Sequence, residues 1–453
     1  MKRAKSVCGL LSFVATAACL AAAPADFKAG VGRVKITPEG PIWLSGYASR
    51  THPSEGVVHD LWIKALALED WRGARTVIVG ADLIALPRAI TDPVAARLQA
   101  RYGLERARIL FNASHTHTAP VVRSNLTAMY ALDEENARRI QSYGDVIAQA
   151  LFDAVAAALG DLKPARIYYG EGWGSFAVNR REATAKGMRI GVNPSGPSDH
   201  TVPALKITTP DGALRAIVFA YACHNTTLTG DFYRISGDYA GFAQLALEKA
   251  HPGATAIFLQ LCGADQNPNP RGTLELARQH GESLAAEVSR VINGPLKPLR
   301  GPLRAAFLPT ELRFAPHTRE MFEQRLSDNN PYRQRHARLM LQAYDERRPI
   351  RTTVYPVQAL RFDRDLTLVA LAGEVVIDYQ LRIKREYGEG EPVVVAGYSN
   401  DVPCYIPSRR VLKEGGYEAV DSMIYYGMPG PFDEDVEETL MAAVRKVMKL
   451  VGR

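Results

Sequence analysis

The chain has 453 residues, of which 47% are hydrophobic and 23% are charged, so it has room for one large or two ordinary globular domains. The formal net charge at pH 7 is +7, and no block of Lys and Arg is interleaved with aromatic residues, which argues against a nucleic-acid-binding protein. Beyond the N-terminus no stretch is long and apolar enough to predict a transmembrane segment.

The N-terminus has the pattern of a secretory signal peptide. Three cations in the first five residues precede an apolar run from Val7 to Ala22, and residues 21–23 are small enough for cleavage. We therefore predict that residues 1–23 are removed and that the protein is exported to the periplasm or the medium. Cys19 follows a poor lipoprotein cleavage sequence, so we favour a free protein over a lipid-anchored one.

After this cleavage the chain would keep three cysteines, namely Cys223, Cys262 and Cys404. An odd number leaves at least one thiol free, so no disulfide framework is expected and the core must stabilise the fold. We expect all three to be buried as small apolar side chains.

Apolar strands and amphipathic helices alternate along the rest of the chain. The expected strands are 27–36, 61–69, 76–79, 108–111, 166–169, 214–223, 254–261, 356–362, 366–371 and 393–397. The expected helices are 91–101, 133–162, 241–250, 274–292, 322–347 and 440–451, and the expected loops include 175–190 and 262–270. This alternation predicts a single α/β domain over residues 24–453, with a mixed β-sheet core flanked by helices.

A His-x-His pair follows one of these strands. His115 and His117 come directly after the apolar run 108–111, and Ala119-Pro120 ends the segment. In an extended chain, side chains two residues apart point to the same side, so both imidazoles can face one point. Neutral imidazole is the commonest nitrogen ligand of zinc, although a hydrogen-bonded structural pair is the more frequent role of such a motif.

Further ligand-type side chains stand at or just after other strands. His224 follows the strand 214–223, Glu374 follows the strand 366–371, and Tyr405 lies after the strand 393–397. Each has an ordinary structural alternative: a buried histidine bonded to the backbone, a helix-capping carboxylate and a core tyrosine. Because ligands of α/β folds bind beyond the carboxyl ends of strands, we interpret the set together as a site for a divalent metal, preferably zinc with one open position.

At these residues the chain resembles the catalytic domain of the neutral/alkaline (non-lysosomal) ceramidase family. The resemblance runs from about residue 27 to 430 and rests on seven stretches in the family's order: 30–38, 115–120, 179–180, 236–241, 373–374, 400–405 and 417–418. It implies hydrolysis of the N-acyl amide bond of a sphingolipid, which yields a fatty acid and an amine. A single motif such as His-x-His is unspecific, whereas seven motifs in the family's order are specific for the family.

The resemblance also assigns roles to individual residues. It implies zinc ligands at His115, His224, Glu374 and Tyr405, with His117 near the metal-bound water. It places the family's Asn-Arg motif at Arg180 and a second active-site tyrosine at Tyr417.

Two features depart from the family pattern. The serine of its Gly-Asp-x-Ser-Pro-Asn motif is replaced by Asn267, and an amide side chain is not a nucleophile. We also expect the C-terminal immunoglobulin-like domain of ceramidases to be absent. Both departures weaken the case for ceramide itself as the substrate, and leave the inference of a metal-dependent hydrolase intact.

We therefore predict an exported, zinc-dependent amidohydrolase that cleaves an N-acyl amide, either small or lipid-like. His117 would act as general base, positioned by Asp238 or Asp82, while Arg180 and Tyr417 would face the oxyanion. Asn267 would position substrate or water. A zinc esterase or phosphoesterase, and a secreted binding protein without catalytic activity, remain alternatives.

Overall fold

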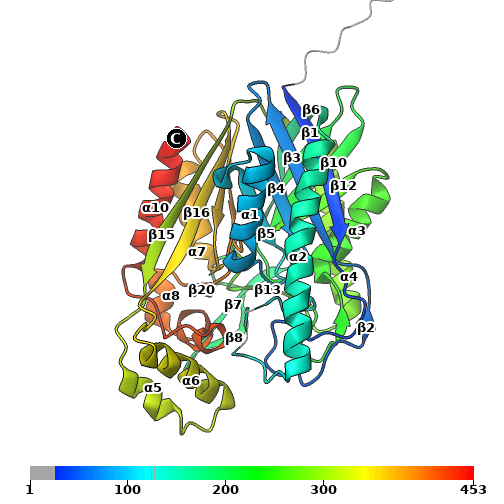
Figure 1. The fold of residues 1–453 in the computed structure, drawn as a ribbon. Helices are drawn as coiled ribbons and strands as arrows, with labels where there is room; N and C mark the ends of the chain where they lie inside the picture. Colours follow the sequence, from blue (N-terminus) through cyan, green and yellow to red (C-terminus); the bar gives the residue numbers. More distant parts are fainter. Residues whose placement is uncertain (1–25, 124, 127) are drawn as a thin grey trace, which may run out of the picture.

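Two β-sheets form the centre of the computed structural model, which describes residues 26–123, 125–126 and 128–453 (Figure 1). In the order in which they pair, the main strands of the nine-stranded sheet are β12 (Thr255–Gln260), β10 (Leu214–Tyr221), β9 (Thr201–Thr208), β6 (Lys163–Trp173), β1 (Phe27–Lys35), β3 (Trp62–Asp70), β4 (Arg75–Ala81) and β5 (Ile109–Ala113), with β14 (Lys297–Pro298) beside β6. The second sheet has the order β15 (Leu303–Arg313), β16 (Thr352–Phe362), β17 (Leu366–Leu371) and β19 (Val393–Ala396).

Both sheets are mixed. Strands β4 and β5, β10 and β12, and β17 and β19 pair in parallel, while the other pairs within the two sheets are antiparallel. Apolar side chains such as Leu66, Ile257 and Leu368 form one cluster between the two sheets. This burial on both faces explains why the central strands have near-continuous apolar sequences.

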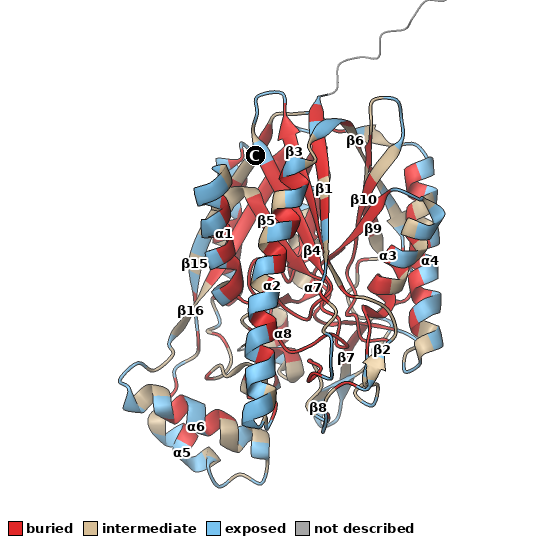
Figure 2. Ribbon diagram, turned by 45° about the vertical axis from the view of Figure 1, so that its right-hand side comes forward, coloured by how far each residue is buried: buried red, intermediate tan, exposed pale blue. Residues whose placement is uncertain are grey.

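Helices cover the outer faces of both sheets, with their exposed sides turned to solvent (Figure 2). The helices packed on the sheets are α1 (Arg88–Tyr102), α2 (Glu134–Gly160), α3 (Asp238–Ala250), α4 (Leu274–Asn293), α7 (Ile377–Tyr387) and α10 (Val436–Leu450). Helix α2 packs on β1 because that strand has glycines where the helix approaches. A Cβ atom at Gly30 would lie 2.1 Å from the carbonyl oxygen of Ala158, and one at Gly32 would lie 2.1 Å from that of Ala154.

Short elements gather at one end of the sheets, at the bottom of Figure 1. A hairpin of β7 (Ala177–Thr184) and β8 (Gly187–Asn193) pairs with β13 (Gln266–Pro268), and β18 (Glu374–Val375) pairs with β20 (Tyr405–Ile406). The same end contains α5 (Arg319–Arg325), α6 (Pro331–Asp345), α8 (Arg409–Glu414), a π-helical turn (Tyr417–Asp421) and α9 (Met423–Tyr426). Strands β2 (Gly56–Val57) and β11 (Arg234–Ile235) pair in parallel, and a 3₁₀ turn (Arg106–Arg108) precedes β5.

The predicted fold class is confirmed, but four local predictions are wrong. Three concern the segments that follow, and the fourth concerns the start of α1. Residues 175–190, expected as loop, form most of the β7–β8 hairpin, which is stabilised by its pairing with β13. The expected loop 262–270 contributes β13 itself. The single helix expected over 322–347 is two helices, because the Asn330 side chain caps a new helix that has Pro331 in its first turn.

Helix α1 begins three residues before the predicted start at Thr91 and contains Pro93 in its interior. A distant residue supplies the cap that the local sequence lacks, since Asp401 accepts a hydrogen bond from the backbone N–H of Arg88 at 3.0 Å. The predicted signal peptide, residues 1–23, lies outside the described residues. Within residues 26–453 that the structure describes, no helix combines the length and apolar character needed to cross a membrane.

Candidate metal centre

Two histidines are fixed by backbone carbonyls at the ends of β5 and β10. His115 adopts the left-handed region with a φ of 62°, and its Nδ1 lies 2.8 Å from the carbonyl oxygen of Ile84. His224 directly follows Cys223 beyond β10, and its Nδ1 lies 2.7 Å from the carbonyl oxygen of Gly263. A carbonyl can only accept, so each Nδ1 carries the proton and each Nε2 presents a lone pair.

A carboxylate and a phenol face these two lone pairs. The parallel pairing of β18 with β20 places Glu374 opposite Tyr405. Oε2 of Glu374 lies 3.0 Å from Nε2 of His115 and 3.0 Å from Nε2 of His224. The hydroxyl of Tyr405 lies 3.3 Å from Nε2 of His224.

This arrangement fits a cation and is unfavourable without one. Oε2 of Glu374 is buried and receives no hydrogen bond from the described residues, although two imidazole lone pairs point at it. Like-signed atoms held so closely in a dry interior repel one another unless a positive ion lies between them. Four donors at zinc bond lengths are about 3.3–3.5 Å apart in a tetrahedron, close to the spacing found here.

The protonation states suit metal binding as well. Burial, together with the positive charge of Arg180, lowers the pKa of His224 to about 4, so the ring is neutral at pH 7. Neutral imidazoles and an ionised carboxylate are the forms that bind a divalent metal.

His117 lies beside the four donors and is held differently. Its Nε2 is 3.1 Å from Nε2 of His115, and its Nδ1 is buried with no hydrogen-bond partner among the described residues. The ring packs edge-on against Tyr47, with 4.9 Å between centroids, and against Gly46, where a Cβ atom would come within 2.3 Å of Nδ1. Burial and the neighbouring His115 and His224 lower the pKa of His117 well below its usual value, so it is a neutral base.

The expectation that Asp238 or Asp82 positions His117 is wrong. The carboxylate of Asp238 accepts hydrogen bonds from the backbone N–H groups of Leu228 and Tyr239, at 2.8 and 2.6 Å. Asp238 itself has a φ of 52° at the first residue of α3. Asp82 accepts instead from the backbone of Trp62 and the side chain of Gln244. Both carboxylates are therefore bonded to groups other than His117.

Arg180 connects Tyr405, one of the four donors, to Asn267 and Glu418 by hydrogen bonds. It lies on β7, is buried, and donates to the Tyr405 hydroxyl at 3.0 Å, to Oδ1 of Asn267 at 3.3 Å and to Oε1 of Glu418 at 2.8 Å. Glu418 also accepts a hydrogen bond from Arg181, so one buried carboxylate stabilises two arginines. The guanidinium has five N–H donors, and this geometry leaves some of them free for a ligand.

Asn267 lies on β13 where the family pattern has serine. Its Oδ1 accepts from Arg180 and from the hydroxyl of Thr226, both at 3.3 Å, because an arginine can only donate. The Nδ2 group, for which the described part of the chain provides no acceptor, is therefore available as a donor. Tyr417 starts the π-helical turn, with its ring centroid 5.4 Å from that of Tyr405.

These side chains line a cavity of about 260 Å³. Five residues described above line it, namely His117, Tyr405, Arg180, Asn267 and Tyr417. The rest of its wall is formed by Gly46, Tyr47, Ala48, Met129, Ile190, Thr226, Arg271 and Tyr425. The structure thus brings together every residue predicted for the site except Asp238, whose carboxylate bonds the backbone of Leu228 and Tyr239.

Sequence reasoning missed residues that hold the donors in place. The hydroxyl of Tyr426 donates to Oε1 of Glu374, leaving only Oε2 for an ion. Asn225 accepts a hydrogen bond from the N–H of His117 at 3.3 Å through its carbonyl and donates through its side chain to the carbonyl of Ser114. The position of Asn225 directly after His224 was the only sequence signal for it, and Tyr426 had none.

The three cysteines match their predicted packing. Cys223, Cys262 and Cys404 are all buried and free of disulfides. Burial raises the pKa of each thiol well above its usual value, so none is a ready thiolate ligand.

Comparison with known proteins shows where this chain belongs. Residues 27–283 match the model of the neutral/alkaline non-lysosomal ceramidase N-terminal family. The chain is a member of that family. Its β1 motif with Gly30 and Gly32 and its His-x-His pair fall within the matched part.

Curated relatives include the neutral ceramidase of Pseudomonas aeruginosa, 26% identical over 285 residues, which are 59% of this chain and 41% of the relative. The neutral ceramidase of Drosophila melanogaster is 26% identical over 284 residues, with 59% and 40% covered. The chain therefore aligns with about two fifths of these relatives. The crystal structure of the Pseudomonas aeruginosa neutral ceramidase has the same fold, with a TM-score of 0.73 and 21% identity over 94% of this chain and 75% of that one.

Proposed function

We propose that this protein is an exported, zinc-dependent hydrolase of N-acyl amides. The observation that carries the proposal is the buried Oε2 of Glu374, which faces the lone pairs of His115 and His224 at 3.0 Å and lacks a hydrogen-bond donor among the described residues. Membership of the ceramidase family supports an amide as the bond that is cleaved. His115, His224, Glu374 and Tyr405 would hold the ion.

Bound zinc supplies two kinds of chemistry in such sites, since it acidifies water and polarises a carbonyl oxygen. His117 is the base that this chain offers, because it is neutral, lies against the donors and points Nε2 toward them. In the proposed reaction His117 takes a proton from the attacking water and passes it to the leaving nitrogen. Tyr47 and Gly46 keep its ring in this orientation.

The opposite wall would bind the carbonyl oxygen. Arg180 has free N–H donors beside Tyr405, and Nδ2 of Asn267 is free to donate into the same cavity. Tyr417 lines the same cavity. Because Asn267 cannot form a covalent intermediate as a serine can, the proposal has water attack the substrate directly.

The deciding experiment is a hydrolysis assay on zinc-loaded protein with matched N-acyl amides, carboxylic esters and phosphoesters. We expect amides to be cleaved, and His117→Ala to reduce the rate by about 10²–10⁴, the usual contribution of a general base. Cleavage of esters or phosphoesters alone would favour the alternative hydrolases. A fully metallated protein that cleaves nothing would leave only a binding function.

Export is tested separately from catalysis. We expect protein recovered from the periplasm or medium to begin near Pro24, as read by N-terminal sequencing. An intact Met1 on exported protein would contradict the predicted cleavage, and a lipid on Cys19 would show anchoring instead.

A further inference from the structure

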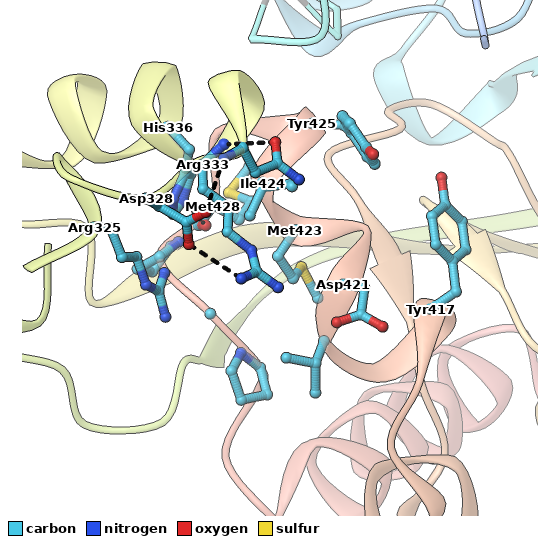
Figure 3. Close-up of a pocket in the computed structure, with 15 residues that line it drawn as sticks. Arg325, Asp328, Arg333, His336, Tyr417, Asp421, Met423, Ile424, Tyr425 and Met428 are labelled. Atoms are coloured by element: carbon cyan, nitrogen blue, oxygen red, sulfur yellow. Dashed lines mark hydrogen bonds and ion pairs between the residues drawn. The ribbon is translucent and has the colours of Figure 1, made fainter. Parts of the chain in front are cut away.

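A second cavity, of about 450 Å³, adjoins the candidate active site (Figure 3). Tyr417 and Tyr425 line both cavities, so the two are separated by little more than these rings. The far wall of the second cavity is formed by α5, α6 and the turn between them, and it carries Arg325, Arg333 and His336. A molecule bound at the metal donors and long enough to pass these two rings would place its far end in the second cavity.

Arg325 is the unusual residue of this cavity. It is half-buried at the last residue of α5, and no carboxylate of the described chain lies within ion-pair distance of its guanidinium. Its guanidinium lies over the ring of Phe322 on the same helix, with 5.4 Å between Cζ and the ring centroid. Burial and the nearby positive charge of Arg333 lower the pKa of Arg325, which indicates two cations held near each other.

Asp328 lies near Arg325, and its negative charge partly offsets the effects that lower the pKa of Arg325, but no ion pair between the two is found among the described residues. Oδ1 of Asp328 accepts from the backbone N–H of Asn330 at 2.8 Å, and Oδ2 accepts from Nη1 of Arg333 at 3.1 Å. Asp328 therefore stabilises the turn between α5 and α6 together with Arg333. Arg325 is left with donors that face the cavity.

The remaining polar groups of the cavity define what could fill it. His336 donates through Nε2 to the carbonyl of Met428, so its buried Nδ1 is an unpartnered acceptor. Asp421 is exposed and lies between the guanidinium of Arg333 and Tyr417 in the view of Figure 3. An alkyl chain placed here would desolvate Arg325 without compensation, whereas an anion beside Arg325 would gain a charge-assisted hydrogen bond.

We propose that Arg325 forms an anion subsite for the substrate, so that the preferred N-acyl amide carries a carboxylate at the end remote from the scissile bond. This inference rests on the proposed amide hydrolysis and narrows its substrate class. Arg333 adds positive charge, and Asp421 disfavours anions bound close to Tyr417. The preferred substrate would thus be an acidic amide with a spacer, and not a molecule with two plain alkyl chains.

Two matched substrate pairs test the subsite on zinc-loaded protein. The first compares N-dodecanoyl aminohexanoate with N-dodecanoyl aminohexanol, which places the charge on the amine side. The second compares the mono-hexylamide of dodecanedioic acid with the hexylamide of dodecanoic acid, which places it on the acyl side. We expect the acid of at least one pair to have a kcat/KM about tenfold or more above that of its neutral partner.

Arg325→Gln should remove that preference through KM, by about tenfold to a hundredfold, with kcat and the neutral substrates unchanged. Arg338→Gln is the matched control, because it removes the same charge from α6 outside the cavity. It should keep the preference, and equal melting temperatures of the two variants would show that folding is not the cause.

A non-hydrolysable ligand separates this inference from the proposed function. Calorimetry with N-dodecylsulfonyl aminohexanoate should show binding that is weakened about tenfold or more by Arg325→Gln. Hydrolysis of neutral amides without preference for the acid in either pair would overturn the subsite and leave the proposed function standing. Binding that depends on Arg325 without any hydrolysis would support the subsite and refute the proposed amide hydrolysis. Neither binding nor hydrolysis would refute both proposals.

Discussion

The two sides of the candidate site are built in different ways. On the metal side, His115 and His224 follow core strands, and backbone carbonyls fix the proton on each imidazole. On the opposite wall, Arg180 and Tyr417 come from a hairpin and a π-helical turn. Arg180 is held by side chains, chiefly the carboxylate of Glu418, and Tyr417 packs against the ring of Tyr405. The first side depends on the sheets, whereas the second depends on a buried ion-pair network.

This difference predicts different responses to substitution. A change on the metal side should remove the ion and all activity that depends on it. A change on the opposite wall should leave the ion in place and alter only rates or substrate binding.

The largest effect is expected for His224→Ala. Loss of one of four ligands leaves Glu374 with a single imidazole partner, so zinc content should fall from about one per chain to near zero and activity should disappear. Metal analysis of the purified protein measures this directly. His52→Ala, at an exposed histidine outside the site, should retain both zinc and activity. Full metal content in His224→Ala would show that the ligand set is wrong.

The variant His117→Ala tests whether His117 acts as a general base or as a metal ligand. The ring nitrogens of His115, His117 and His224 that could bind a metal all lie within 4.8 Å of one another, so a site with three histidine ligands is a geometric alternative. If His117 is the base, the variant keeps its zinc while kcat falls by about 10²–10⁴. Loss of zinc with loss of rate would make His117 a ligand instead.

The convergence of the proposed metal ligands could be predicted because these residues sit at or just after strand ends. The apolar run before His115 and the one before His224 predict buried strands, and strand ends in an α/β fold meet at a common edge. The contact that the structure contradicts is the one between His117 and a carboxylate. A carboxylate was expected there, whereas the ring is held by Tyr47 and Gly46, which are distant in sequence and leave no local pattern.

The opposite wall was less accessible to sequence reasoning. The hairpin that carries Arg180 reads as loop, since its pairing with β13 and the contact of Arg181 with Glu418 depend on tertiary structure. Only the resemblance to ceramidases placed Arg180 and Tyr417 near the site. The second cavity, with Arg325, was not anticipated because the turn that separates α5 from α6 was predicted as helix.

Asn267→Ala tests the wall at the position where the family serine is replaced. Removing one oriented donor should lower kcat by about 10²–10³ with zinc unchanged and without an acyl-enzyme, as followed by single-turnover kinetics and mass spectrometry. Asn269→Ala, two residues further and exposed, is the matched control and should keep its rate. An accumulating acyl-enzyme in the wild type would contradict direct attack by water.

The smallest expected effect is on the pH dependence of stability, and it involves Asp265. Asp265 is buried, and its carboxylate accepts from the backbone N–H of Ile377 and from the side chain of Asn179, both at 2.9 Å. Burial, with a contribution from Asp378, raises its pKa to about 6. A carboxyl whose pKa is raised on folding stabilises the protein fully below its unfolded pKa, and that contribution is lost as pH rises through the folded value.

Asp265→Asn removes this titration. Relative to the wild type, the variant should therefore gain up to about 3 kcal/mol in free energy of unfolding between pH 4 and pH 7, the scale of a shift of about two pKa units. The loss of one hydrogen bond to the amide lowers its stability at every pH, so the slope and not the absolute value is the test. Denaturant unfolding at fixed zinc measures it, with Asp153→Asn on the exposed face of α2 as the control. Parallel pH profiles for Asp265→Asn and the wild type would show that folding does not raise the pKa of Asp265.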